Sequence, residues 1–288
     1  MTNENDEVYI NGGFYSSSTQ STSNDSLTAG VMDVKGDFVI DCYYNSYVFS
    51  PRESHKVVFS GASNQNVIFN NCYGDSYLNN VEITNPGNGN VSFGTEEKSV
   101  VFKGEFNDGG HNIGGYIQPS GNASLKNGTL HGSIYITNYS SIYGTYHITG
   151  DVIIKNNMYL YGTMMVDGNI IFKDYGRLYL YGKETGSYLE VKGDIKASED
   201  CTYCYIDFNH GSLKLHGNLN IPCCSVSAYV YNTVPNDTNK FFLCGTAKQT
   251  IEVASGSSFG QIIIENTSED GVYSSDKLDA LSIKDDHD

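Results

Sequence analysis

Three groups of residues in this chain have types and spacings that could do chemistry. Cys201-x-x-Cys204 and, about one repeat later, Cys223-Cys224 offer four thiols of the kind that bind zinc. Asp207, in the segment DFNHG with His210, offers a carboxylate of the kind that glycoside hydrolysis uses. The third group is a series of Tyr-x-Tyr pairs, which could form an amphipathic contact surface.

The cysteines favour packing over chemistry. An odd number of cysteines cannot all pair within one chain, and the start MTNENDEVYINGG shows no secretory signal, so we expect reduced, partly buried thiols. Residues that are adjacent or three apart on a strand point to opposite faces, so four thiolates should not converge. We therefore predict stacked core thiols rather than a disulfide between neighbouring coils or a metal, and no cofactor. The seven are Cys42, Cys72, Cys201, Cys204, Cys223, Cys224 and Cys244.

An enzymatic site is not indicated. Glycosidases need two carboxylates about 5.5 or 6.5–9.5 Å apart, and Asp207 with Glu190 or Asp174 is not singled out by any pattern. No phosphate loop, nucleophile elbow or metalloprotease helix appears. We interpret His131 and His216 as turn residues. The acidic and amide residues that follow coil-start glycines are interpreted as solvated turn residues: Asp37, Asp151, Asn169, Asp194 and Asn218.

The tyrosines are predicted to form two outward columns. If Leu160, Leu180, Cys204 and Val230 face the core, the residues that flank them face water. We favour a structural ladder, with a binding strip for a glycan or a protein surface as the alternative. The strip comprises Tyr143, Tyr159, Tyr161, Tyr179, Tyr181, Tyr203, Tyr205, Tyr229 and Tyr231, and Tyr47/Phe49 is expected to repeat it nearer the N-terminus.

Internal repeats indicate what positions these residues. Units start at Gly132, Gly150, Gly168, Gly193 and Gly217, which are spaced by 18, 18, 25 and 24 residues. Apolar residues follow each glycine at positions two apart, which is strand periodicity, and no helical periodicity accompanies them. Such short units cannot bury their own apolar face, so they must stack. The fold class predicted is all-β, a single-stranded parallel β-helix (β-solenoid) with coils of about 18–25 residues; the alternative is a β-sandwich.

A larger duplication frames the regular coils. KGDFVIDC matches HGNLNIPC, and HKVVFSGASNQNVIF matches NKFFLCGTAKQTIEV, which aligns Gln65 with Gln249. We expect both glutamines to bond strand-end backbone. The predicted organisation is one continuous solenoid over 1–288, with a first cassette at 30–93, regular coils at 111–216, a second cassette at 211–274 and an acidic tail at 275–288.

Charge excludes several partners. The chain has 288 residues, 17 of them basic and 33 acidic, so its net charge is −16. Phosphate backbones and anionic lipid surfaces need basic residues, so we predict no nucleic-acid partner and no binding to anionic membranes. No apolar run is long enough for membrane insertion.

The strings DSLTAGVMDVKGDF, HKVVFSGASNQNV and YLNNVEITN resemble repeat segments of large cell-surface, adhesin-like proteins of anaerobic Gram-positive bacteria. The regular middle also resembles bactofilins. The first resemblance implies a non-enzymatic surface spacer or binding rod, located at the cell surface if the chain is cut from a longer one. The second implies a cytoplasmic polymer that self-associates end to end. A carbohydrate-binding or carbohydrate-active β-helix is a further alternative.

Overall fold

The computed structural model describes residues 1–18, 27–43, 47–72, 76–85, 90–95, 98–182, 186–227, 239–274 and 278–285. The chain divides into two compact units, Met1–Tyr135 and Ile136–Asp288. Among the described residues neither unit contains an α-helix, and the one helical turn is the 3-10 segment Lys126–Gly128. The described part of the chain has no helix of the length and apolarity needed to cross a membrane.

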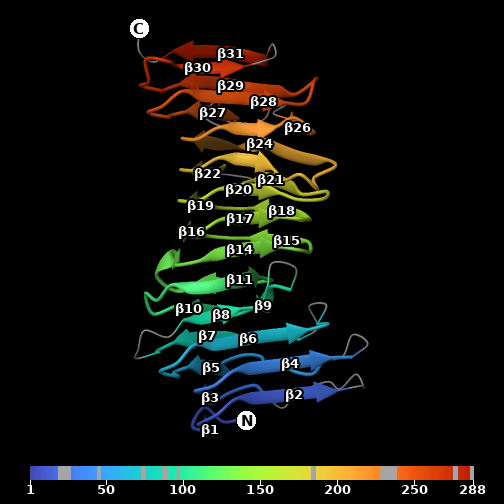
Figure 1. Ribbon diagram of the computed structural model, residues 1–288, viewed down its shortest axis with the longest axis vertical. Coiled ribbons are helices and arrows are strands. Elements are labelled where there is room, and N and C mark those ends of the chain that lie inside the picture. Colours follow the sequence, from blue (N-terminus) through green and yellow to red (C-terminus); the bar gives the residue numbers. More distant parts are fainter. Residues whose placement is uncertain are drawn as a thin grey trace. The chain divides into compact units, whose positions relative to one another are not determined.

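The first unit is built from two parallel sheets (Figure 1). Each strand pairs with the strand one coil later along the chain, so neighbours in a sheet are not consecutive in sequence. One sheet consists of β1 (Glu7–Ile10), β3 (Val31–Val34), β5 (Lys56–Phe59), β7 (Asn80–Ile83), β10 (Glu105–Asn107) and β12 (Ser124–Leu125). The other consists of β2 (Phe14–Ser18), β4 (Phe38–Cys42), β6 (Gln65–Asn70), β8 (Val91–Phe93), β11 (Ile113–Pro119) with β9 (Val100–Phe102) beside it, and β14 (Ser133–Ile136); β13 is Thr129–Leu130.

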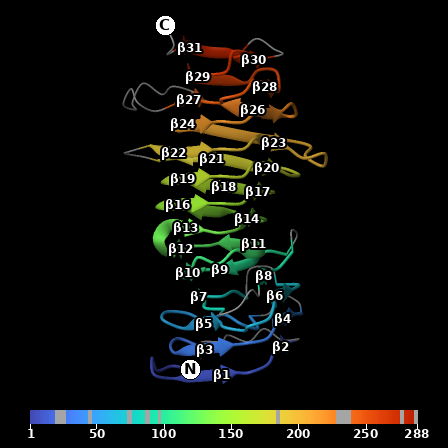
Figure 2. The same ribbon diagram turned by 60° about the vertical axis from the view of Figure 1, so that its left-hand side comes forward.

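The second unit winds through three parallel sheets (Figure 2). The first contains β17 (Val152–Ile154), β20 (Ile170–Phe172), β23 (Ile195–Ala197), β25 (Leu219–Ile221), β28 (Gln249–Val253) and β30 (Val272–Ser274). The second contains β16 (Thr145–Ile148), β19 (Thr163–Val166), β22 (Ser187–Val191), the end of β24 (Cys204–Leu215), β27 (Lys240–Leu243), β29 (Ser258–Ile264) and β31 (Asp279–Asp285). The third contains β15 (Ser140–Ile142), β18 (Asn157–Leu160), β21 (Arg177–Tyr181), the start of β24 and β26 (Cys224–Ser227).

The predicted parallel β-helix is confirmed, and the β-sandwich alternative is wrong because strands pair in parallel with the next coil. The coils differ from expectation in one respect: the regular ones carry a third strand, such as Thr163–Val166, after the two that the repeats indicate. Alternation is the same there, since Met164 and Val166 are buried.

The core of the second unit consists of columns of apolar side chains. Val152, Ile170, Ile195, Leu219 and Ile251 are register partners on five successive strands, and each is at most 1% exposed. Burying such a side chain contributes about 1.5–3 kcal/mol. The inward face of every coil is therefore completed by the coils on either side of it.

The coil-start glycines are required by close approach of successive coils. A Cβ on Gly193 would lie 2.5 Å from the carbonyl oxygen of Gly168, and one on Gly217 would lie 2.4 Å from that of Gly193. Any larger residue would push neighbouring coils apart at this corner. The glycine register that marks the repeats is thus a packing requirement.

The residues after these glycines lie in turns and are partly exposed, as expected, but their side chains also bond the next coil in a hydrogen-bonded ladder. Asp151 Oδ1 accepts from the backbone N–H of Asn169 at 2.7 Å, and Asn169 Oδ1 accepts from that of Asp194 at 2.9 Å. Asp194 and Asn218 continue the series, each accepting from the next coil, at Asn218 and Thr250. Because Asp and Asn alternate, no two carboxylates are neighbours in this ladder.

The two aligned glutamines make the same bonds in the two cassettes, as expected. Gln65 donates to the carbonyls of Val34 and Gly36 at 2.9 and 2.8 Å and accepts from the Gly61 N–H at 2.8 Å. Gln249 donates to the carbonyls of Leu215 and Gly217 at 3.1 and 2.7 Å and accepts from the Gly245 N–H at 2.8 Å. Both side chains are buried. We call each arrangement a glutamine clamp.

Candidate functional site

The outward surface of β15, β18, β21, β24 and β26 carries most of the described candidate tyrosines, and we call it the tyrosine face. Strand alternation creates it: Met158, Leu160, Leu178 and Leu180 are buried, so the residues between them point outward. Tyr159 is level with Tyr179 on the neighbouring strand, and Ser141 precedes them in the same row.

The rings stack along two columns. In the first, the ring centroids of Tyr139 and Tyr159 are 4.8 Å apart, and those of Tyr159 and Tyr179 are 4.5 Å apart with planes 9° from parallel. In the second, Tyr143 and Tyr161 stack at 4.6 Å and 7°. Tyr181 then approaches Tyr161 edge-on at 6.0 Å.

Stacking decides what the columns can bind. Both faces of the Tyr159 ring are covered, by Tyr139 and by Tyr179, so its edge remains for other contacts. A sugar stacks on the face of an aromatic ring, and neighbouring rings already occupy both faces of Tyr159, whereas Tyr139 at the end of the column is 61% exposed. Burial accordingly raises the pKa of the Tyr159 and Tyr161 hydroxyls, with the neighbouring tyrosines adding to the shift.

Tyr203 and Tyr205 do not continue the columns in the expected register. Tyr205 is level with Arg177, and Asp207 instead of Tyr203 occupies the row of Tyr179, because β24 meets β21 four residues further along than the repeats predict. The ring of Tyr205 still lies 5.9 Å from that of Tyr179, whereas Tyr203 contacts the Arg177 guanidinium at 5.8 Å. A register shift after Tyr179 then brings His210 beside Tyr181, with ring centroids 5.4 Å apart.

The remaining residues predicted for the tyrosine strip are either a partly buried pair or outside the described residues. Phe49 is 2% exposed and packs against Phe14 and Phe38, so Tyr47/Phe49 is not an outward pair. Tyr229 and Tyr231, with Val230, lie outside the described residues.

A shallow groove of about 420 Å³ borders the tyrosine face. It is polar and charged: Lys155 and Asp174 form an ion pair across it at 3.0 Å, and Tyr175 is 64% exposed. The other lining residues are Thr137, Asn156, Asn157 and Arg177. Sequence reasoning missed this groove, because it forms at the turns between coils rather than along a strand.

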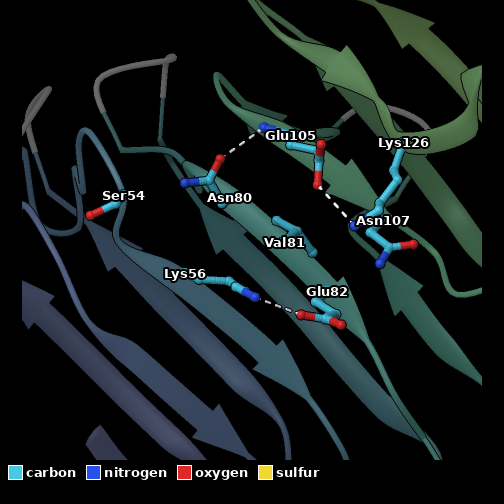
Figure 3. A pocket seen from close by; sticks show the side chains of 8 residues that line it. All are labelled: Ser54, Lys56, Asn80, Val81, Glu82, Glu105, Asn107 and Lys126. Atoms are coloured by element: carbon cyan, nitrogen blue, oxygen red, sulfur yellow. Dashed lines mark hydrogen bonds and ion pairs between the residues drawn. The ribbon is translucent and has the colours of Figure 1, made fainter. Parts of the chain in front are cut away.

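A smaller groove of about 140 Å³ lies in the first unit over β5, β7 and β10 (Figure 3). Its carboxylates are matched by lysines: Lys56 pairs with Glu82 at 2.7 Å, and Lys126 with Glu105 at 3.7 Å. Asn80 accepts from the backbone N–H of Glu105 at 2.9 Å. Ligand pockets are usually about 300–1,000 Å³, so this groove is too small and too well paired to be a strong ligand site.

The acidic residues considered for hydrolysis lie on different elements: Asp207 on β24, Glu190 on β22 and Asp174 in a turn. Asp207 is on the tyrosine face, and burial raises the pKa of its carboxyl. Glu190 is on β22, in a different sheet, where His216 contacts it at 2.8 Å and holds the pKa of its carboxyl below the usual range. Asp174 is paired with Lys155.

The cysteines depart most from expectation. Cys42 and Cys72 form a disulfide with their Cα atoms 5.1 Å apart, and Cys204 and Cys224 form another with Cα atoms 4.5 Å apart. The four sulfurs of Cys201, Cys204, Cys223 and Cys224 lie within 4.8 Å of one another. They converge because Cys201 and Cys223 are in turns, so the alternation of strand side chains does not govern them.

Comparisons of the chain with protein-family models, with curated proteins and with solved structures found no match.

Proposed function

We propose that the chain is a non-enzymatic structural solenoid, a rigid spacer at a bacterial cell surface. The observation that carries this proposal is the tyrosine face, where the rings of Tyr139, Tyr159 and Tyr179 stack on one another. Other polar side chains also make their contacts within the solenoid, since the coil-start ladder and the glutamine clamps bond one coil to the next. In a solenoid, nearest-neighbour contacts of this kind supply the stability.

The test replaces four ladder tyrosines with serine: Tyr159, Tyr161, Tyr179 and Tyr181. Loss of the stacked rings should lower the melting temperature, with losses accumulating as the replacements are added singly. Tyr273→Ser is the matched control, because this ring is 57% exposed in the same unit and lies outside the ladder. An unchanged melting temperature would contradict the structural role.

A second candidate function is glycan binding beside the tyrosine face. The groove with Arg177, Asn157 and the exposed Tyr175 ring favours it, because carbohydrate recognition combines planar groups with hydrogen-bonding side chains. A glycan array probed with the wild type and with Tyr175→Ser tests this candidate. Binding that is lost in Tyr175→Ser, while the melting temperature is kept, would favour a binder over a spacer.

A further inference from the structure

The four sulfurs near the start of β24 and β26 form a group that the proposed function does not use. Cys204 and Cys224 are the first residues of these strands and are register partners on neighbouring coils. Cys201 and Cys223 lie in the turns that lead into the same two strands. Each coil thus contributes one thiol from a turn and one from a strand start, at the same corner.

The spacing of the four sulfurs suits a single metal ion. In a tetrahedral zinc site with Zn–S distances of about 2.3 Å, the sulfurs lie about 3.8 Å from one another. Here all four lie within 4.8 Å, and the Cys223 and Cys224 sulfurs are 3.5 Å apart. To complete the tetrahedron, the Cys204 and Cys224 sulfurs must separate from their disulfide bond on reduction, and the longest of the other separations must shorten by about an ångström. The Cys-x-x-Cys spacing of Cys201 and Cys204 is that of many structural zinc sites.

The surroundings of the cluster also fit a structural site. Cys204 and Cys224 are fully buried and Cys201 is 8% exposed, while the partly exposed Cys223 provides an entry path. A bound divalent cation would offset the repulsion between the four thiolate charges and stabilise the deprotonated thiols.

We propose that Cys201, Cys204, Cys223 and Cys224 of the reduced chain bind one Zn²⁺ ion as a four-thiolate site. Binding releases the four thiol protons and leaves four Zn–S bonds. The site excludes the Cys204–Cys224 disulfide, whose reduction needs two electrons and two protons. Two external thiols supply both and become a disulfide, whereas a phosphine supplies the electrons, becomes a phosphine oxide and leaves water to supply the protons and the oxygen. The oxidised chain therefore carries a disulfide at this corner, and the reduced chain carries the ion.

The experiment reduces the full chain with a phosphine under anaerobic conditions, removes metal, and titrates with Co²⁺. We expect one Co²⁺ per chain, with sulfur-to-cobalt charge-transfer absorption that Zn²⁺ abolishes. The double variant Cys201→Ser/Cys223→Ser keeps the disulfide-forming pair but loses two ligands, and should bind at least about 100-fold more weakly. Cys244→Ser is the control, because this thiol contacts Glu265 at 3.0 Å and lies outside the cluster.

A second readout does not depend on the variants folding. Zn²⁺ should lower the alkylation of these four thiols in the reduced wild type, as read by mass spectrometry, while the alkylation of Cys244 should be the same with and without Zn²⁺. Absence of Co²⁺ charge-transfer absorption in the reduced wild type would overturn the proposal. Equal alkylation of all thiols with and without Zn²⁺ would overturn it as well.

Discussion

The two cassettes share their clamps and differ at their cysteines. Gln65 and Gln249 make the same three bonds, and the buried hydroxyls of Ser76 and Ser257 each accept from a backbone N–H of an adjacent segment. Cys42, however, is the buried last residue of β4, whereas the aligned Cys223 lies in a turn, partly exposed.

One residue accounts for this difference. Asp41 lets β4 run on to Cys42, but the aligned residue in the second cassette is Pro222, and β25 ends before it at Ile221. Proline lacks the N–H that a central strand donates, so pairing stops there. Cys223 is thereby turned toward Cys224. The two cassettes therefore share the geometry of the glutamine clamp and differ at the ends of β4 and β25.

The largest expected effect comes from breaking the clamps. Gln65→Ala and Gln249→Ala each leave two carbonyls and one N–H without these bonds in a buried region, so each should lower the free energy of unfolding by about 4 kcal/mol. Hydrogen exchange read by mass spectrometry assigns the loss to one cassette. Similar losses are expected in both, and a loss in only one would show that the clamps are not equivalent.

Removing the disulfide of the first cassette should cost slightly less. Cys72→Ser opens a loop of 30 residues between Cys42 and Cys72, which corresponds to about 3–4 kcal/mol. Denaturant unfolding should compare the free energy of unfolding of Cys72→Ser with that of Cys244→Ser, because Cys244 is a free cysteine that closes no disulfide loop. Equal stabilities of the two variants would mean that this bond does not constrain the chain.

Acid should weaken the first cassette selectively. His55 is fully buried, and burial lowers its pKa to about 4 from 6.5, whereas the aligned residue of the second cassette is the buried Asn239. Between these pH values the His55 imidazole is protonated in the unfolded chain and neutral in the folded chain. Stability should therefore fall by up to about 3 kcal/mol as the pH drops from 6.5 to 4, and level off below.

His55→Asn copies the second cassette and serves as the control. In this variant the pH-dependent loss within the first unit should disappear, as followed by hydrogen exchange at several pH values. If the loss persists in His55→Asn, another group is responsible.

The smallest expected effect concerns the coil-start ladder. Asn169→Asp places a carboxylate between Asp151 and Asp194, which should destabilise the second unit by about 1 kcal/mol, and less at high salt. Asp37→Asn copies Asn218 in the first cassette and should be nearly neutral. Melting at low and high salt measures both, and an equal effect of the two changes would contradict a ladder role.

The sequence predicted what depends on periodicity. Alternating apolar residues and recurrent glycines indicate the coils, and the aligned cassettes locate Gln65 and Gln249. What failed depends on turns and bulges. The four thiols converge because two of them leave the strands, and Pro222 is the one signal in the sequence that could have shown it. The tyrosine register fails after Tyr179, where β24 shifts against β21, and no local pattern marks that shift.

The most direct test of the structural account is a double-mutant cycle on Tyr159 and Tyr179. Their rings stack at 4.5 Å, and a stacked pair contributes about 0.5–1.5 kcal/mol beyond burial. If the ladder holds the coils together, Tyr159→Ser, Tyr179→Ser and the double variant should show a coupling of about 1 kcal/mol in denaturant unfolding. A coupling indistinguishable from zero would contradict the account.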